Sequence, residues 1–379
     1  MKIAFLFGAG VSIPSGMDTT QDLTEKILRG ENVVQLSGIY SPVEDPDRFN
    51  WDHKNEYISR IKRLFHVSKN YFENHYSFYE REMNYEDYYY LFDSMHTDEN
   101  MEYENPLVTF FSDHLFKVHS SLFEPIEEYL APLRLIDLMA EVKNYIMDLV
   151  AFNLNKIPED LSQFEILNEI YNDKNYSNAY IFTVNHDTLI EQYLRKNKIE
   201  YSDGFVRIDE SVKMWNPEFY KDKINLFKLH GSIDWSHYDS NDPYKKKVCI
   251  YIIPPRDISR PVIIIGSFNK LSEYSRGINF DLQFLFAKYL NECSRLVISG
   301  YSFGDQGINS RIINWLYGSR DRKITLIHKN EDELFQSARP AIRTIRHWDI
   351  NEKTDLIRII PKWFQECNWQ EIKESIGQS

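Results

Sequence analysis

Four short clusters of residues that can do chemistry each follow a run of apolar residues. They are listed here in chain order: Gly8-Ala9-Gly10-Val11-Ser12, Thr183-Val184-Asn185-His186-Asp187, His230-Gly231 and Gly300-Tyr301-Ser302. Glycines let a backbone turn sharply and approach a ligand closely, and Asn, Asp and His supply hydrogen bonds and proton transfer. We therefore ask whether the four clusters form one ligand site.

The first cluster ends the apolar run 3–7 with Gly-x-Gly. Exposed N–H groups in such a turn, with the positive end of a following helix, favour a pyrophosphate. The third glycine of a G-x-G-x-x-G fingerprint is absent, and a plain strand-to-helix turn also uses glycines. Phosphate binding and a plain turn both remain open.

The other clusters also have two interpretations each. In an extended segment Asn185 and Asp187 point the same way and can meet one ligand, whereas Asp187 can also cap a helix that begins near Thr188. His230 has a glycine behind it, and an imidazole with an ordinary pKa near 6.5 suits a general base, although a lone histidine is often structural. The segment 299–305 either holds the second half of a dinucleotide or only connects a strand to a helix.

The elements that must position these clusters are strands alternating with helices. Short apolar runs typical of buried parallel strands occupy residues 3–7, 179–184, 225–229, 262–265, 295–299 and 324–328. Helical patterns follow at 188–195 and 309–317. This alternation predicts an α/β fold with an open, mostly parallel sheet that binds ligands at the carboxyl ends of its strands.

A different region separates the first strand from the second. Residues 40–172 are rich in Tyr, Phe, Glu and Lys, with helical spacing at 57–65 and 135–149, and we expect a large inserted helical subdomain there. Residues 1–39 and 173–345 then form the Rossmann-like domain. We expect residues 346–379 to be a helical tail packed through Trp348, Trp363 and Trp369.

Composition narrows the class of protein. The net charge of −13 disfavours nucleic acid as a partner, because an acidic surface repels phosphates. The three cysteines form no C-x-x-C pair, so we expect neither a zinc site nor a disulfide framework, as in a reducing cytoplasm. No apolar stretch approaches the roughly 20 residues of a membrane span. We expect a soluble cytoplasmic protein.

The order of the four clusters resembles the sirtuin superfamily, in particular the sirtuin-like NAD hydrolases of bacterial antiphage defence. The resemblance covers residues 1–20 and about 178–330. It implies that the sheet is Rossmann-like and of the sirtuin type. It also implies that Gly8, Ala9, Gly10, Val11 and Ser12 line the pyrophosphate and ribose of NAD, with Gly300, Tyr301 and Ser302 on the adenosine half. Asn185 and Asp187 would lie beside the nicotinamide ribose, and His230 would be the catalytic histidine.

Several departures disfavour protein deacylation. Sirtuin deacylases usually carry S-G-I-P followed by F-R, whereas this chain has Ser15-Gly16-Met17-Asp18 and no arginine before Arg29. Val184 replaces their glutamine, and their zinc ribbon of paired cysteines is missing. His328 stands where an asparagine is expected near the last strand.

The resemblance therefore implies hydrolysis of NAD to nicotinamide and ADP-ribose, with no metal. His230 would be the general base, Asn185 would orient the water or the ribose, and Asp187 would fix the ribose. His186 is expected to point the opposite way and is the weaker catalytic candidate. The alternatives are a non-catalytic sensor of NAD or ADP-ribose, and an NAD-dependent deacylase.

Regulation by assembly is also implied, because a constitutive NAD hydrolase would kill its own host. We therefore expect a homo-oligomer that acts in abortive infection, with a HerA-type ATPase as a possible partner. We expect neither a membrane nor a nucleic acid to be a direct partner.

Overall fold

The computed structural model describes residues 1–45, 54–78, 81–124, 133–238, 247–253, 259–267 and 269–377. The chain forms two compact units. The first comprises Met1–Met17, Asn155–Ile264 and Lys270–Ser379, and the second comprises Asp18–Leu154 and Ile265–Asn269. Compared with the expected insertion at 40–172, the second unit begins and ends earlier in the chain and includes a short segment from much later.

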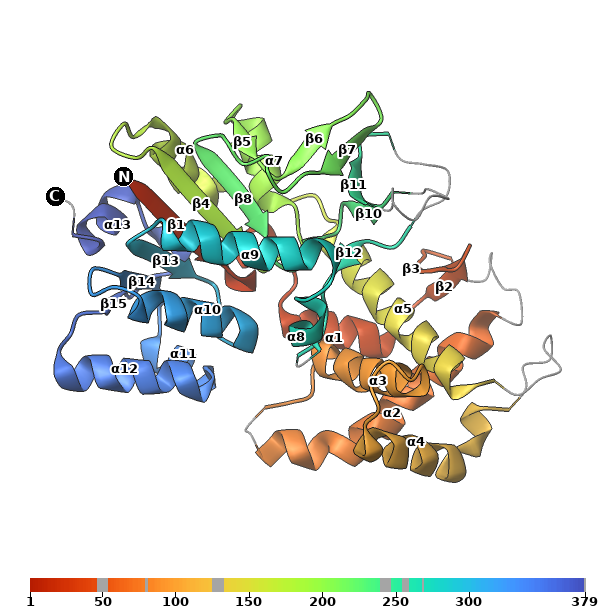
Figure 1. Cartoon of the computed structure of the whole chain (residues 1–379). Helices are drawn as coiled ribbons and strands as arrows, with labels where there is room; N and C mark the ends of the chain where they lie inside the picture. Colours follow the sequence, from red (N-terminus) through yellow and green to blue (C-terminus); the bar gives the residue numbers. More distant parts are fainter. Residues whose placement is uncertain are drawn as a thin grey trace. The chain divides into compact units, whose positions relative to one another are not determined.

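A seven-stranded parallel sheet is the centre of the first unit (Figure 1). The strands, in their order across the sheet, are β15 (Ile357–Ile360), β14 (Lys323–Ile327), β13 (Arg295–Ser299), β1 (Lys2–Phe7), β4 (Asn178–Thr183), β8 (Ile224–Lys228) and β5 (Tyr201–Ser202). The chain runs outward from β1 to one edge and then from β13 to the other. The predicted mixed α/β fold with a mostly parallel sheet is confirmed.

The strands are apolar because both faces of the sheet are covered. On one face Phe182 of β4 packs against Phe286 with ring centroids 4.7 Å apart. On the other face Phe7 of β1 lies 4.9 Å from Phe364, and Phe5 lies 6.4 Å from Trp369. Leu6 of β1 pairs with Phe182 and belongs to the same buried cluster as Phe286, so successive residues of β1 face opposite layers and its apolar run is unbroken.

Helices and short strands complete the first unit. The helices are η1 (Ala9–Val11), η2 (Ile13–Ser15), η5 (Ser162–Phe164), α6 (Glu165–Asn172), α7 (Leu189–Lys196), α8 (Lys270–Glu273), α9 (Gly277–Asn291), α10 (Gln306–Tyr317), α11 (Glu331–Ser337), α12 (Pro340–Glu352), η7 (Phe364–Glu366) and α13 (Trp369–Ser375). A four-stranded antiparallel sheet contains β10 (Trp235–His237), β11 (Val248–Tyr251), β7 (Val212–Trp215) and β6 (Phe205–Arg207). A two-stranded sheet pairs β12 (Val262–Ile263) with β9 (Gly231–Ser232).

The second unit is mainly helical. It contains α1 (Thr20–Arg29), the hairpin of β2 (Val33–Leu36) and β3 (Ile39–Pro42), α2 (Lys54–Phe78), α3 (Tyr85–Glu99), α4 (Pro106–Val118), η4 (Ser120–Leu122) and α5 (Leu135–Leu154). Its core is aromatic: the ring of Phe65 lies 5.3 Å from Tyr88 and 6.0 Å from Tyr145. The Tyr and Phe content of this region therefore includes buried packing.

Two expectations need correction. The apolar run at 262–265 is not a strand of the main sheet, because β12 pairs antiparallel with the residues just after His230. The C-terminal tail is not only helical, because β15 is the edge strand beside β14. Of the expected tryptophan anchors, Trp369 is buried, whereas Trp348 and Trp363 are 47% and 43% exposed.

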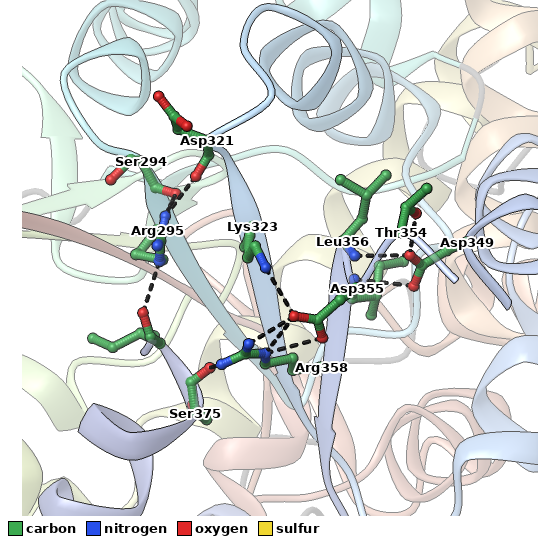
Figure 2. A network of polar contacts seen from close by, with 12 residues as sticks. Ser294, Arg295, Asp321, Lys323, Asp349, Thr354, Asp355, Leu356, Arg358 and Ser375 are labelled. Carbon is green, nitrogen blue, oxygen red and sulfur yellow. Dashed lines mark hydrogen bonds and ion pairs between the residues drawn. The ribbon is translucent and has the colours of Figure 1, made fainter. Parts of the chain in front are cut away.

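Polar contacts hold β15 at the edge of the sheet (Figure 2). Asp349 of α12 accepts hydrogen bonds from the N–H groups of Leu356 and Ile357, at 2.7 and 3.1 Å, where the chain enters β15. Asp355 binds Arg358 at 2.6 Å and Lys323 of β14 at 2.8 Å. Edge strands are often short, and the four residues of β15 are too few to give a clear strand pattern in the sequence.

Among the helices in the described parts of the chain, none is long and apolar enough to span a bilayer.

Candidate functional site

The four clusters follow four adjacent strands of the main sheet. In the parallel register Phe7 at the end of β1 pairs with both Thr183 of β4 and Ser299 of β13, and Thr183 pairs with Lys228 of β8. The strands therefore end at one level, and their loops begin side by side. Since β1 is also where the chain reverses its direction across the sheet, this edge is where doubly wound proteins bind ligands.

The glycine-rich turns after β1 and β13 touch through their backbones. A Cβ atom added to Gly8 would lie 2.4 Å from the carbonyl oxygen of Gly300, and one added to Gly10 would lie 2.7 Å from the Gly300 Cα. Gly300 itself has a φ of 64°, and its Cβ would lie 2.5 Å from the nitrogen of Val11. Close packing of two turns is thus a sufficient reason for these three glycines.

The packing of the two turns uses the backbone donors that could otherwise bind a phosphate. The N–H groups of Gly8 and Gly10 donate to the carbonyls of Ser299 and Gly300, both at 3.0 Å. Val11 and Ser12 donate to Gly8 and Ala9 within the turn, at 3.1 and 3.0 Å. The N–H groups of these four residues therefore have acceptors within the protein, as in the plain-turn interpretation of the glycines. The turn also leads into 3₁₀ helix η1 rather than directly into an α-helix.

Ser12 joins the first cluster to the second. Its hydroxyl donates to Asp187 Oδ2 at 2.7 Å and accepts from Asn185 Nδ2 at 3.0 Å. The same Asn185 amide donates to the Gly8 carbonyl at 3.0 Å, and all three side chains are buried. Asn185 and Asp187 thus converge, as their alternate spacing indicated. Asp187 also accepts from the N–H of Leu189, the first residue of α7, at 3.1 Å, although the N-cap of that helix is Thr188.

His230 lies in a buried polar cluster that the sequence did not indicate. Its Nε2 atom is 2.6 Å from the hydroxyl of Tyr274 and 3.0 Å from Asp305 Oδ2. Tyr274 also donates to the same carboxylate oxygen. Burial raises the pKa of Asp305, but the contacts with His230, the charge of Lys270 and the hydrogen bond from Tyr274 together outweigh burial and hold that pKa well below its usual range. The carboxylate is therefore ionised.

The ring of His186 lies near that of His230, with ring centroids 6.3 Å apart. Burial holds the pKa of His186 well below 6.5, and the nearby His230, Lys270 and Lys228 lower it further. A hydrogen bond between the His186 ring and the backbone of Gly231 acts in the opposite direction and raises the pKa. Within the described residues, neither His186 Nδ1 nor Asn185 Oδ1 has a hydrogen-bond partner. Both are buried acceptor positions of the kind that a ligand's donors satisfy.

A buried ion pair supports the loop that carries Asn185. Lys228, the last residue of β8, lies 2.9 Å from Glu191 of α7, and the two side chains are 3% and 8% exposed. The ammonium group also donates to the carbonyl of Asp187 and, at 3.5 Å, to that of His186. Burial raises the pKa of Glu191 to about 6, with Lys228 opposing this increase.

The remaining sequence-predicted residues take different positions. Ala9 and Ser302 are exposed, and Val11 is buried beneath the turn. The Tyr301 ring lies in the hydrophobic core, and its hydroxyl donates to Asn309 at 2.9 Å, so the structure explains Tyr301 by packing. Sequence reasoning missed Tyr274 and Lys228 entirely. It noticed Asp305 only as the end of a glycine-containing turn.

Within the residues that the structure describes, no group of three or more His, Cys, Asp or Glu side chains is arranged to hold a metal ion.

The fold and the site define a doubly wound α/β protein with a buried polar cluster at the strand ends. Residues 179–351, from β4 into α12, match the family model of the SIR2-like domain. A solved structure described as a complex of a Sir2 homolog with NAD is similar at 13% identity, with a TM-score of 0.39 over 99% of this chain and 89% of that chain. No curated protein matches the chain significantly.

Proposed function

We propose that this protein hydrolyses NAD to nicotinamide and ADP-ribose at the ends of β1, β4, β8 and β13. One observation carries the proposal: Ser12, Asn185 and Asp187 form a single hydrogen-bonded group at the same sheet edge as the buried His230. The similarity of residues 179–351 to the SIR2-like domain supports this assignment, because Asn185, Asp187 and His230 all lie inside the matched region.

The unpartnered atoms at the site fit the chemistry of NAD. Asn185 Oδ1 and His186 Nδ1 are buried acceptors that lack donors among the described residues. NAD offers ribose hydroxyls and a carboxamide NH₂, which are such donors. The nucleotide also carries a pyrophosphate, and the exposed Ala9 and Gly10 of the β1 turn are the surface we assign to it.

The reaction breaks the bond between C1′ of the ribose and the nicotinamide nitrogen. Nicotinamide leaves with the bonding electron pair and becomes neutral, while positive charge develops on the sugar as in other glycosyl transfers. Water forms the new bond to C1′ and gives up one proton to the ring of His230, which then releases it to solvent. Asn185 orients the water or the ribose, and Asp187 fixes the ribose hydroxyls through the group that it shares with Ser12.

Nicotinamide release from NAD by the purified protein tests the proposal. We expect His230→Ala and Asn185→Ala to lower turnover by about 10²–10⁴-fold, the usual contribution of a positioned acid–base group. His347→Ala is the matched control because His347 is exposed on α12. Wild-type turnover in a folded His230→Ala protein would exclude His230 from the reaction. Tight NAD binding without hydrolysis by the wild type would favour a sensor, and O-acyl-ADP-ribose formed from an acetylated peptide would favour a deacylase.

We further propose, from the sequence resemblance alone, that this activity serves abortive infection. The protein would then act as a homo-oligomer, with a HerA-type ATPase as partner. Light scattering at several protein concentrations tests self-assembly, and a strictly monomeric protein would contradict it. Phage challenge of cells that carry the wild type or the His230→Ala variant tests the setting, since equal phage yields would exclude a defence role.

A further inference from the structure

The contacts of His230 suggest how its ring is held and charged. Its Nε2 atom faces an oxygen of Asp305 at 3.0 Å, and the two side chains are only 4% and 5% exposed. A nitrogen that faces a buried carboxylate carries a hydrogen, because a bare lone pair there would be repelled. This contact therefore fixes the tautomer of the neutral ring.

We propose that Asp305 and Tyr274 are positioning residues that orient His230, and that Asp305 stabilises the charged form of the ring when it takes up the proton of the attacking water. The part of this proposal that concerns turnover rests on the proposed function. The coupling of Asp305 to His230 can be measured without any activity. Neither residue belongs to the set that the sequence assigned to catalysis.

Asp305 is itself held rigidly at both oxygens. It is the N-cap of α10, where Oδ1 accepts the N–H of Ile308 at 3.0 Å. Its Oδ2 faces His230 and accepts the hydroxyl hydrogen of Tyr274. A carboxylate fixed by a helix start on one side can orient an imidazole on the other at little cost in conformational entropy.

The positive charges around His230 would disfavour a second proton on its ring, and the negative charge of Asp305 opposes this effect. Cationic groups act on the cluster from several elements: Lys270 of α8 lowers the pKa of both Asp305 and His186. Arg311 of α10 lies 5.8 Å from the centre of the Tyr274 ring. Tyr301 has a pKa raised well above 10, chiefly by burial, and is neutral, as is His186. Asp305 thus helps to offset these charges when the His230 ring becomes positive.

Tyr274 donates a hydrogen bond to this carboxylate and so weakens the attraction between Asp305 and the His230 ring. Burial first, and then the charge of Asp305, raises the Tyr274 pKa well above 10, so the phenol keeps its proton and donates it in a hydrogen bond to Asp305. Removing that donor leaves the full carboxylate charge to act on His230. The two residues therefore have opposite effects on the titration of the His230 ring.

Two conservative variants test this arrangement. Asp305→Asn keeps an N-cap of equal quality, so α10 is preserved while the charge is lost. We expect the midpoint pH at which the His230 ring titrates to fall by about one to three units. We also expect turnover to fall about 10²-fold or more, with NAD affinity changed less than about threefold. In Tyr274→Phe the midpoint should rise, and the acid limb of the pH–rate profile should move with it. Tyr317→Phe is the control because Tyr317 is exposed on α10.

The readout is NMR titration of the histidine rings in the full-length protein, with the His230 signal assigned by its loss in His230→Gln. An unchanged His230 midpoint in folded Asp305→Asn would overturn the proposal. So would wild-type turnover in that variant. If the wild type fails to hydrolyse NAD while the Asp305→Asn midpoint still falls, the proposed function is overturned and the charge coupling stands.

Discussion

The contact between the β1 and β13 turns yields a prediction that does not depend on any activity. Gly300 adopts a left-handed conformation, with φ of 64°, and a Cβ there would lie 2.5 Å from the Val11 nitrogen and 2.9 Å from the Gly10 Cα. All of these neighbours are backbone atoms, so no side chain can rotate to make room. We therefore expect Gly300→Ala to force the two turns apart.

The expected loss in the free energy of unfolding of Gly300→Ala has two parts. An L-residue in the left-handed region costs about 1–2 kcal/mol. The backbone shift that relieves the clash costs about 1–3 kcal/mol more, as for overpacking elsewhere. We expect a loss of about 3 kcal/mol in the free energy of unfolding, equivalent to a fall of roughly 6–12 °C in the thermal midpoint for a unit of this size.

Two glycines of the same unit separate these parts. Gly277 has a φ of 49°, but a Cβ there meets nothing within 4 Å, so Gly277→Ala carries only the conformational cost. At Gly304 an added Cβ meets only Ser302 Oγ, at 3.5 Å, and Gly304→Ala should be close to neutral. Thermal and urea unfolding of the three variants, followed by circular dichroism, measures the differences.

The expected order of stability is Gly304→Ala, then Gly277→Ala, then Gly300→Ala as the least stable. If Gly300→Ala is no less stable than Gly277→Ala, the turns do not pack as described. Nicotinamide release should fall together with stability in Gly300→Ala, because the displaced β1 turn carries Ser12.

Three further predictions concern the ion pairs and the buried hydrogen bonds. Lys228→Met should lower the free energy of unfolding by about 3–5 kcal/mol, because Glu191 is left as an uncompensated buried charge. Adding Glu191→Met to this variant should restore part of the loss. If urea unfolding shows the same loss in the single and the double variant, the pairing of Lys228 with Glu191 is contradicted. Ser12→Ala should lower kcat for NAD about tenfold to a hundredfold, because a buried carboxylate and amide lose their common partner. Exposed Ser310→Ala is its control, and an unchanged kcat would exclude the role of Ser12. At Asp355, hydrogen bonds from the neighbouring arginine and lysine lower the carboxyl pKa below 3.8. This stabilisation is present above about pH 4 and is lost as the pH falls further, so thermal midpoints measured from about pH 5 to pH 3 should fall less steeply in Asp355→Asn.

The local pattern of the sequence was enough to locate most strands of the sheet. Runs rich in apolar residues predicted β1, β4, β8, β13 and β14 to within a residue or two, because a strand covered on both faces needs mostly apolar residues. The same reasoning placed the polar clusters directly after those strands. The alternation of Asn185 and Asp187 also indicated that both side chains reach one place, which Ser12 occupies.

The neighbours of those clusters depended on tertiary structure. Tyr274 meets His230 across 44 residues and Asp305 across 31, and Tyr274 lies in no motif. The spacing of apolar residues indicates that one face of a helix or strand is buried, but it does not indicate which residues cover that face. The acceptors of the Gly8 and Gly10 N–H groups also depended on tertiary structure. These acceptors are carbonyls of Ser299 and Gly300, and only the adjacency of β13 to β1 brings them into reach.

Strand order and the edges of the sheet were likewise decided by the fold. Residues 262–265 have the composition of a buried parallel strand, yet they pair antiparallel with β9, because a short apolar run does not specify its partner. The edge strand β15 has only four residues, three isoleucines and one arginine, and it joins the main sheet beside Asp349 and Asp355. The sequence alone thus determined which residues are polar at the strand ends and which runs are buried. The tertiary structure decided which of them meet, because contacts between distant residues follow from strand order, and strand order has no local signature in the sequence.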